Sequence, residues 1–152
     1  MTEKTGASLK IRSTQLSDVD GIYALGKSAP KFAVSDTTTF WEKDELEGWV
    51  KEQGKDVLLV AELNGEFVGF LLAKYHSPTK LGTIVDVLVK EPFREQGIGT
   101  ALLQEAKQQL LNKGASYLYA LIQTDNQPSL NLFKSLGFTV GRDMTWVEFL
   151  PE

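Results

Sequence analysis

Hydrophobic and polar residues repeat along the chain with two periods, one typical of strands and the other of helices. The pair Asn64-Gly65 stands between two apolar runs, and this dipeptide is the strongest short sequence signal for a β-hairpin. Alternating or continuous apolar runs predict strands over residues 9–14, 56–63, 66–75, 81–89 and 116–122. The β-forming residues of 138–150 predict two further strands or a hairpin.

Helical spacing predicts helices between these strands. Ser17 and Asp18 can cap the first helix, whose apolar residues begin at Val19. Further helices are expected over residues 42–53, 97–112 and 127–136, and a glycine follows closely after each of the last two. Residues 28–40 contain Pro, Ser and Thr and are expected to form a loop.

The predicted order of elements is β-α-α-β-β-β-α-β-α-β-β. Because no internal repeat and no linker divides it, we expect residues 9–152 to form a single domain behind a flexible tail of residues 1–8. A chain of this length can bury one core. The order predicts an α+β fold around a mixed, largely antiparallel central sheet.

Composition excludes several kinds of protein. The formal net charge of −4 argues against a nucleic-acid partner. The chain has no cysteine, so it can form no disulfide, thiol nucleophile or Cys-ligated metal site, and this fits a cytoplasmic location. Its single histidine, His76, cannot form a multi-histidine site, so we expect no metal. The polar N-terminus and the lack of an apolar run of about 20 residues predict neither a signal peptide nor a membrane span.

Two glycines, Gly97 and Gly99, stand where an apolar run is followed by a helical pattern. The first turn of a helix carries main-chain N–H groups without intrahelical acceptors, and glycines let a large anion approach them. Arg94 and Thr100 can add further donors. The turn therefore predicts a phosphate or pyrophosphate site, although its spacing is neither that of a P-loop nor that of a dinucleotide fingerprint. A tight strand–helix turn without a ligand is the simpler alternative.

The segment "VLVKEPFREQGIGTALL" (87–103) resembles motif A of the GNAT (Gcn5-related N-acetyltransferase) family. Downstream, "NQPSLNLFKSLGF" (126–138) resembles a second segment of the same family, in the same order. The resemblance implies a three-layer α/β/α fold whose sheet is splayed between the strands at about 81–89 and 116–122. It also implies transfer of an acetyl group from acetyl-CoA to a primary amine of a small molecule or protein.

The resemblance further implies which residues contact acetyl-CoA. Its pantetheine would run along the strand that precedes the glycine turn and bond the main chain like an added strand. Its pyrophosphate would lie on the main-chain amides of the turn, and the downstream segment would supply three further positions. These residues are Val87, Leu88, Val89, Arg94, Glu95, Gln96, Gly97, Ile98, Gly99, Thr100, Asn126, Ser129 and Phe133. Asn126 can also serve as a helix cap.

This sequence departs from the family pattern at two of these positions. Glu95 places an anion near the expected pyrophosphate, which predicts a modest cofactor affinity. Phe133 stands where the family often has a tyrosine general acid, and losing such a group can cost roughly 10²–10⁴ in rate. A thiol with a pKa near ~8.5 leaves without much help, so we read Phe133 as compatible with catalysis. Tyr117 and Tyr119 could substitute, but ordinary strand aromatics are the simpler interpretation.

Asp86 is the one charged residue within "TIVDVLV", and a carboxylate in a central strand is costly unless it is paired or used. The family often keeps an acidic base near this point, so the resemblance implies that Asp86 deprotonates the amine; a structural hydrogen-bond acceptor is the alternative. Main-chain N–H groups near Leu88 or Val89 could stabilise the oxyanion. His76 is expected to be an exposed residue at a strand end.

The sequence does not identify the amine acceptor. In the family the first two helices and their loop shape the acceptor pocket, and this segment holds aromatic and acidic residues. They are Phe32, Phe40, Trp41, Trp49, Asp36, Glu42, Asp44, Glu45 and Glu47. Such a rim would favour a cationic acceptor, although a solvated helix face explains most of the carboxylates equally well. A homodimer is also left open.

Two rival functions remain. A catalytically weak CoA-binding module would account for Phe133 and Glu95. A nucleotide- or phosphate-binding domain of another kind could use the same glycine turn, but it would make the segment 126–138 a coincidence.

Overall fold

The computed structural model describes residues 8–29, 40–149 and 151. The chain divides into two compact units, Met1–Leu121 and Ile122–Glu152, and each is described by itself. Most of the expected tail (1–8) and most of the expected loop (28–40) lie outside the described residues. The single domain over 9–152 stays a prediction.

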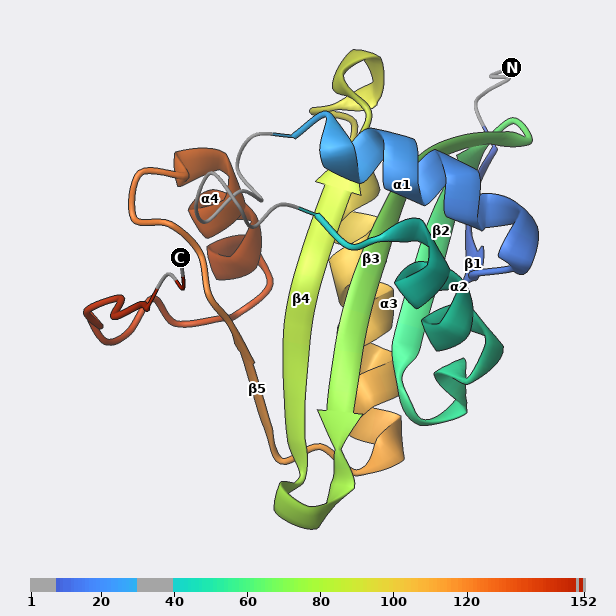
Figure 1. Cartoon of the computed structure of the whole chain (residues 1–152). Coiled ribbons are helices and arrows are strands. Elements are labelled where there is room, and N and C mark those ends of the chain that lie inside the picture. Colours follow the sequence, from blue (N-terminus) through green and yellow to red (C-terminus); the bar gives the residue numbers. More distant parts are fainter. Residues whose placement is uncertain (1–7, 30–39, 150, 152) are drawn as a thin grey trace. The chain divides into compact units, whose positions relative to one another are not determined.

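The first unit is built on a five-stranded sheet whose strands follow one another in chain order (Figure 1). The strands are β1 (Leu9–Ser13), β2 (Val57–Leu63), β3 (Glu66–His76), β4 (Leu81–Val89) and β5 (Tyr117–Ala120). The first four pair antiparallel, and β5 pairs parallel to β4. Asn64 and Gly65 join β2 to β3 with φ angles of 53° and 84°, so the predicted hairpin is confirmed.

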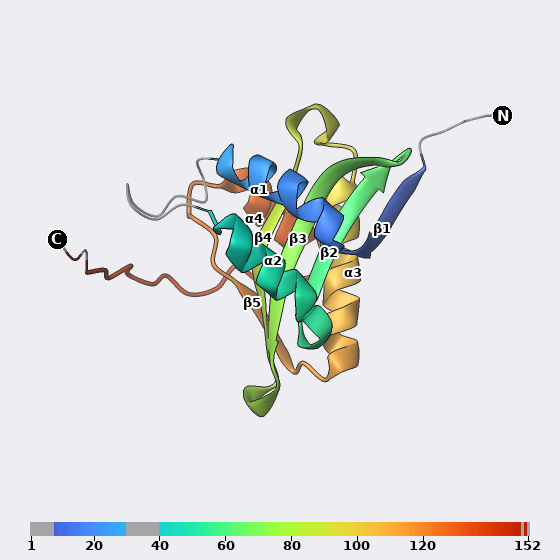
Figure 2. The same ribbon diagram turned by 45° about the vertical axis from the view of Figure 1, so that its right-hand side comes forward.

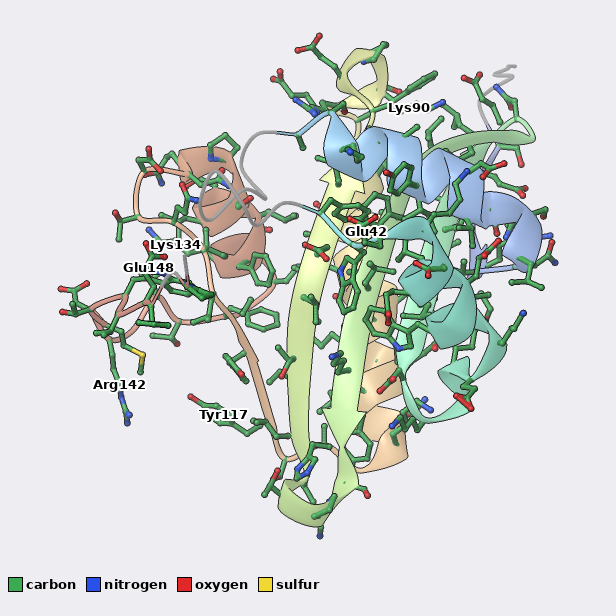
Figure 3. The ribbon with its side chains drawn as sticks, in the orientation of Figure 1. Glu42, Lys90, Tyr117, Lys134, Arg142 and Glu148 are labelled. Atoms are coloured by element: carbon green, nitrogen blue, oxygen red, sulfur yellow. The ribbon has the colours of Figure 1, made fainter. Side chains whose placement is uncertain are left out.

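Helices cover both faces of this sheet. Figures 1 and 2 show α1 (Val19–Lys27) and α2 (Lys43–Lys51) on one face and α3 (Ile98–Lys113) on the other. Glu42 occupies the N-cap of α2 (Figure 3), and Gly114, with φ of 113°, ends α3 as expected. The predicted three-layer α/β/α arrangement around a mixed sheet is therefore confirmed.

Apolar side chains fill the space on both sides of the sheet, which explains why β2 and β3 read as nearly continuous apolar runs. Beneath α1 and α2, the core consists of Val19, Ile22, Phe40, Leu46, Val50, Leu58, Val60, Phe70 and Leu72. The inner residues of α3, Leu102, Leu103, Ala106 and Leu110, are fully buried. The two cores enclose β3 between the layers, and β4, its neighbour in the sheet, is the strand on which the candidate site lies.

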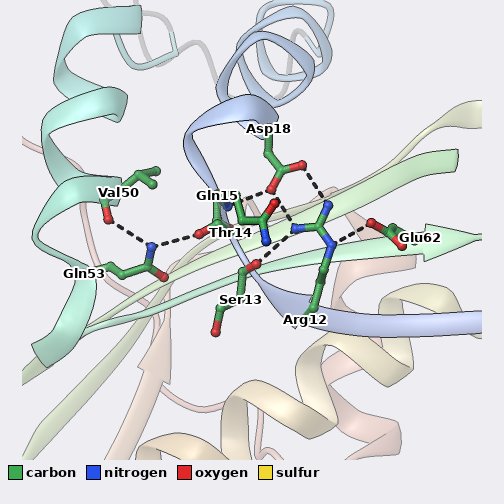
Figure 4. Close-up of polar contacts among 8 residues, drawn as sticks. All are labelled: Arg12, Ser13, Thr14, Gln15, Asp18, Val50, Gln53 and Glu62. Atoms are coloured by element: carbon green, nitrogen blue, oxygen red, sulfur yellow. Dashed lines mark hydrogen bonds and ion pairs between the residues drawn. The ribbon is translucent and has the colours of Figure 1, made fainter. Parts of the chain in front are cut away.

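An ion pair network ties β1 to its surroundings (Figure 4). The Arg12 guanidinium donates to Asp18 at 2.7 and 2.9 Å and to Glu62 at 2.6 Å. Burial opposes ionisation of Asp18, but the hydrogen bonds from Arg12 and from the Gln15 amide outweigh it and hold the pKa of Asp18 below its ordinary value. The network thereby fixes the turn that leads from β1 into α1.

The second unit contains α4 (Gln127–Ser135), which begins at the expected Asn126 cap. Its Phe133 ring packs edge-on against Phe138, with the ring centroids 5.1 Å apart. The expectation of two strands or a hairpin over 138–150 is wrong for the described residues, because 138–149 form no regular element. A strand needs a hydrogen-bonded neighbour, and none of the described residues pairs with this segment, whose Trp146 bonds only locally to Glu148.

Candidate active site

The strands β4 and β5 separate halfway along their length. Their pairing runs from Leu81 opposite Tyr117 to Ile84 opposite Ala120 and then ends. The register between β3 and β4 shifts at the same point, so Val85 is the extra residue of a bulge. Beyond it, Asp86–Val89 pair with β3 alone among the described strands. The predicted splay is confirmed, and over this half one edge of β4, called the open edge below, has no paired strand among the described residues.

The pairing also decides which main-chain groups face that open edge. The Lys90 amide donates to the Val68 carbonyl at 2.8 Å, so Lys90 faces β3. Successive residues of an antiparallel strand direct their N–H groups alternately toward and away from the neighbouring strand, and the β3–β4 register is constant from Asp86 to Val89. Leu88 therefore directs its N–H toward β3, whereas Val87 and Val89 direct theirs away from it. An extended ligand could add to β4 through these two residues.

The chain turns sharply after β4 and reaches the glycine segment. Arg94 Nε donates to the Val89 carbonyl at 2.9 Å, which holds the turn against the end of the strand. Glu95 has φ of 62° and Gly97 has φ of 83°. A left-handed conformation is unusual for a residue with a Cβ, and such strain tends to gather at functional sites. Arg94, Glu95 and Gly97 are exposed.

The glycine turn leads directly into the N-terminus of α3, with Gly97 as the N-cap. The Ala101 amide donates to the Gly97 carbonyl at 3.0 Å. The N–H groups of Ile98, Gly99 and Thr100 precede this first helical bond and are oriented toward the helix end. A Cβ placed on Gly97 would meet no atom within 4 Å. The helix dipole, the N–H groups and the open space suit an anionic ligand such as a pyrophosphate.

Asp86 lies on β4 just past the bulge, opposite Leu72 of β3. The carboxylate is half-buried and accepts a hydrogen bond from the Trp41 indole at 3.0 Å. Burial raises the pKa of Asp86, and the bond from Trp41 lowers it by less, so that the pKa lies above its ordinary value. The side chain is therefore better suited to accept a proton near neutral pH than an exposed aspartate.

Trp41 belongs to an aromatic cluster that the sequence pattern did not predict. Its ring packs on Trp49 with the centroids 4.9 Å apart. Trp49 donates to Asp56 at 2.8 Å, and the same carboxylate accepts the Tyr75 amide at 3.0 Å. The Lys74 ammonium lies 5.4 Å from the centroid of each indole. The two indole rings are thus in contact with the Lys74 ammonium, a cation of the chain itself. They line a surface depression of about 410 Å³.

The expected acceptor rim is only partly supported. Phe40 belongs to the core instead, because it is 7% exposed and packs on an aromatic ring of β3 at 5.8 Å between centroids. Asp44 and Glu45 line the depression beside the two tryptophans. Phe32 and Asp36 lie outside the described residues.

The two candidate general acids on β5 differ in exposure. Tyr117 is 63% exposed and projects away from β4 (Figure 3), while Tyr119 is half-buried opposite Thr83. His76 ends β3, is exposed, and shares a hydrogen bond of 2.8 Å with Thr79. The expectation that His76 is an exposed residue at a strand end is confirmed.

The site residues of the second unit lie at the N-cap and on the first two turns of α4. The Asn126 side chain accepts a hydrogen bond from the Ser129 amide at 3.3 Å, so its capping role is confirmed. Within the described residues, no group of three or more His, Cys, Asp or Glu side chains could hold a metal ion. Among the same residues, no helix has the length and apolar character needed to cross a membrane.

The chain is similar in sequence and in fold to known acetyltransferases. Residues 24–138 match the acetyltransferase (GNAT) family. An N-alpha-acetyltransferase of Sulfurisphaera tokodaii is 32% identical over 148 residues, which cover 89% of this chain and 83% of that protein. A methionine sulfoximine/methionine sulfone acetyltransferase of Pseudomonas aeruginosa is 27% identical over 92% of this chain and 86% of its own length.

Solved structures with a similar fold are also acetyltransferases. An N-acetyltransferase of Staphylococcus aureus superposes with a TM-score of 0.75 at 24% identity, over 88% of this chain and 86% of the other. The chain therefore belongs to the acetyltransferase (GNAT) family, and it is an N-acetyltransferase that uses acetyl-CoA.

Proposed function

We propose that the open edge of β4 and the turn Arg94–Thr100 together bind acetyl-CoA. The observation that carries this proposal is that a strand edge without a paired strand among the described residues is followed, after a short turn, by the glycine segment and a helix N-terminus. The edge suits an extended arm with amide groups, and the turn suits a pyrophosphate. The Arg94 Nε is already bonded to Val89, so its role is to hold the turn, and the main-chain N–H groups supply most of the anion binding.

We further propose that Val87 supplies the N–H group that stabilises the oxyanion. The arm would leave the turn and pass Val89 first, so its acetyl end would lie farther along the strand. Leu88, which the sequence also suggested, directs its N–H toward β3. Val87 directs its N–H to the open edge and is adjacent to Asp86. A donor fixed in a strand does not reorganise when negative charge develops on the carbonyl oxygen.

Asp86 is the proposed base. An amine nucleophile must lose a proton, and the Asp86 carboxylate would accept it directly or through water. The neutral amine nitrogen then bonds the acetyl carbon and the bond from that carbon to sulfur breaks. The departing thiolate takes up the second proton, which the nitrogen releases as the amide forms, so that CoA leaves as the thiol. The half-buried position of Asp86 and its raised pKa support this role. No step requires a metal, and we propose that none takes part. We also propose a cytoplasmic location, which the cysteine-free sequence supports.

We propose an α-amine as the preferred acceptor, with a lysine side chain as the weaker one. The relatives at 30–32% identity are N-alpha-acetyltransferases, which supports this choice. An α-amine has an ordinary pKa of about 7.7–8.0 and a lysine amine one of about 10.4, so a carboxylate can deprotonate the former far more readily. The Pseudomonas relative acts on a small molecule, so free amino-acid derivatives belong in the test as well.

A panel of acceptors tests the function. Thiol release from acetyl-CoA is followed with peptides that have a free N-terminus, the same peptides blocked at the N-terminus but carrying a lysine, amino-acid derivatives and polyamines. Calorimetry with acetyl-CoA, CoA and ATP runs in parallel. We expect acetyl-CoA binding, turnover with α-amines and no affinity for ATP. Tight ATP binding without turnover would favour a nucleotide-binding domain, and CoA binding without turnover on any amine would favour the weak CoA-binding module.

A further inference from the structure

The hydrogen bond between Trp41 and Asp86 joins residues that are 45 positions apart in the sequence. Trp41 precedes α2, and Asp86 lies in the middle of β4. The indole N–H donates to Oδ2 of the carboxylate at 3.0 Å. An indole nitrogen can only donate, so this contact favours the ionised carboxylate as its acceptor.

Trp41 is itself held in place from the opposite side. Its ring is stacked on Trp49, and the Trp49 indole donates to Asp56, which is only 8% exposed. The Tyr75 amide of β3 donates to the other oxygen of Asp56 at 3.0 Å. The two indoles therefore connect a fixed carboxylate near the end of β3 with the carboxylate on β4. A side chain held this way gives its N–H a fixed direction.

We propose that Trp41 is a positioning residue for acetyl transfer, whose indole N–H orients the Asp86 carboxylate and keeps it ready to accept a proton. This inference rests on the proposed role of Asp86 as the base. Because Trp41 bonds Oδ2, Oδ1 is the oxygen assigned to the incoming proton. Burial alone would hold Asp86 protonated over a wider pH range, and a protonated base cannot act. The indole bond opposes that effect without adding a competing charge.

Other charged and titratable side chains lie near Trp41 and Asp86, and any test must leave these side chains unchanged. Lys74 of β3 lies over both indoles. The remaining groups around the depression are Asp44, Glu45, Glu52, Lys55 and Asp56. Tyr23 of α1 packs against the same core. A useful comparison therefore changes one indole N–H and leaves all of these side chains in place.

The two tryptophans provide such a comparison. Trp41→Phe removes the donor to Asp86 and keeps an aromatic ring, while Trp49→Phe removes the same group from the same stack but affects only the bond to Asp56. The readouts are the pH dependence of kcat/KM for acetyl transfer, the KM for acetyl-CoA, and the titration of the Asp86 carboxyl by carbon-13 NMR, assigned with Asp86→Asn. Incorporation of benzothienylalanine at position 41, which replaces the indole N–H by sulfur, provides a second variant if Trp41→Phe folds poorly.

In Trp41→Phe we expect the acidic limb of the pH profile and the Asp86 titration to move together to higher pH, by about one unit. At pH values well below the parent's midpoint a shift of that size lowers the ionised fraction about tenfold, so kcat/KM falls by about that factor there. The KM for acetyl-CoA stays unchanged. Trp49→Phe leaves both midpoints where they are in the parent.

Three results would overturn the inference, and they are distinguishable. If the Asp86 titration is the same in Trp41→Phe and in the parent, Trp41 does not tune the carboxylate, even if Asp86→Asn is inactive and Asp86 remains the base. If Asp86→Asn keeps full turnover, the base role itself fails and the positioning role fails with it. A shift of equal size in Trp49→Phe would also count against the inference, because it would assign the effect to the aromatic cluster in general.

Discussion

The binding role of the glycine turn can be separated from its structural role by one pair of substitutions. Gly97 has φ of 83°, and Gly65, in the β2–β3 hairpin, has φ of 84°. At both positions a Cβ would meet no atom within 4 Å. Gly97→Ala and Gly65→Ala therefore impose the same backbone strain in the same open surroundings, but only the first lies on the proposed pyrophosphate site.

The strain sets the expected loss of stability. An alanine in the left-handed region costs about 1–2 kcal/mol relative to glycine, and neither position adds a clash to that cost. We expect both variants to lose about this amount of unfolding free energy. The methyl group of Gly97→Ala would also stand where the anion approaches the helix N-terminus. Weakening one hydrogen bond to a charged group costs about 1.5–3 kcal/mol, which corresponds to at least a tenfold loss of affinity for acetyl-CoA.

Urea unfolding measures the first quantity and titration calorimetry with acetyl-CoA measures the second. We expect equal stability losses in the two variants and a loss of affinity in Gly97→Ala alone. If Gly97→Ala binds acetyl-CoA as tightly as Gly65→Ala does, the pyrophosphate does not lie on this turn. A loss of affinity in both variants would show that binding merely follows stability.

Three further outcomes are expected. Phe133→Tyr should fold and keep or increase kcat in the thiol-release assay, and a loss of more than tenfold would show that a hydroxyl is not tolerated there. Asp18→Asn should lose about 1–3 kcal/mol of unfolding free energy above pH 4, because it removes the ionised partner of Arg12. The pKa of Asp18 is lowered in the fold, so the difference from the parent should shrink as the pH falls below about 4 and vanish below the folded pKa; a difference that does not shrink with falling pH would indicate a packing effect. Asp86→Asn should lower kcat by roughly 10–10³-fold with unchanged acetyl-CoA affinity, and an unchanged kcat across the pH profile would assign the proton to another group.

Local chemistry explains most of what the sequence predicted correctly. The Asn64-Gly65 hairpin and the end of α3 at Gly114 depend on backbone conformations that few residues adopt, so single positions identify them. The strand 81–89 was predicted with the bounds that β4 has. The splay between β4 and β5 came from the family resemblance, because the bulge at Val85 is one extra apolar residue in an apolar run and leaves no mark in the pattern.

Contacts between distant segments could not be predicted in this way. Trp41 and Phe40 are adjacent aromatic residues, and both were expected at the acceptor rim. The fold buries Phe40 in the core and brings the Trp41 indole to Asp86. Which of two neighbours faces inward depends on how the chain enters α2. The β-forming composition of 138–150 likewise predicted strands, but composition does not provide a pairing partner.

The energetic cost of Asp86 provides a last prediction. Burial raises the pKa of this carboxyl, so the folded chain holds a proton on Asp86 at pH values where the unfolded chain has released it. The contribution of Asp86 to unfolding free energy is therefore least favourable above the folded pKa, and it improves as the pH falls toward about 4, the ordinary value.

Asp86→Asn removes the charge and retains an oxygen that can accept the Trp41 N–H. We expect this variant to be more stable than the parent at pH 7.5 and equally stable near pH 4, as measured by urea unfolding. A residue kept for structure would show the reverse, since its replacement would destabilise the fold at neutral pH. Higher stability combined with lower turnover would mean that the carboxylate is retained for chemistry at a cost to the fold.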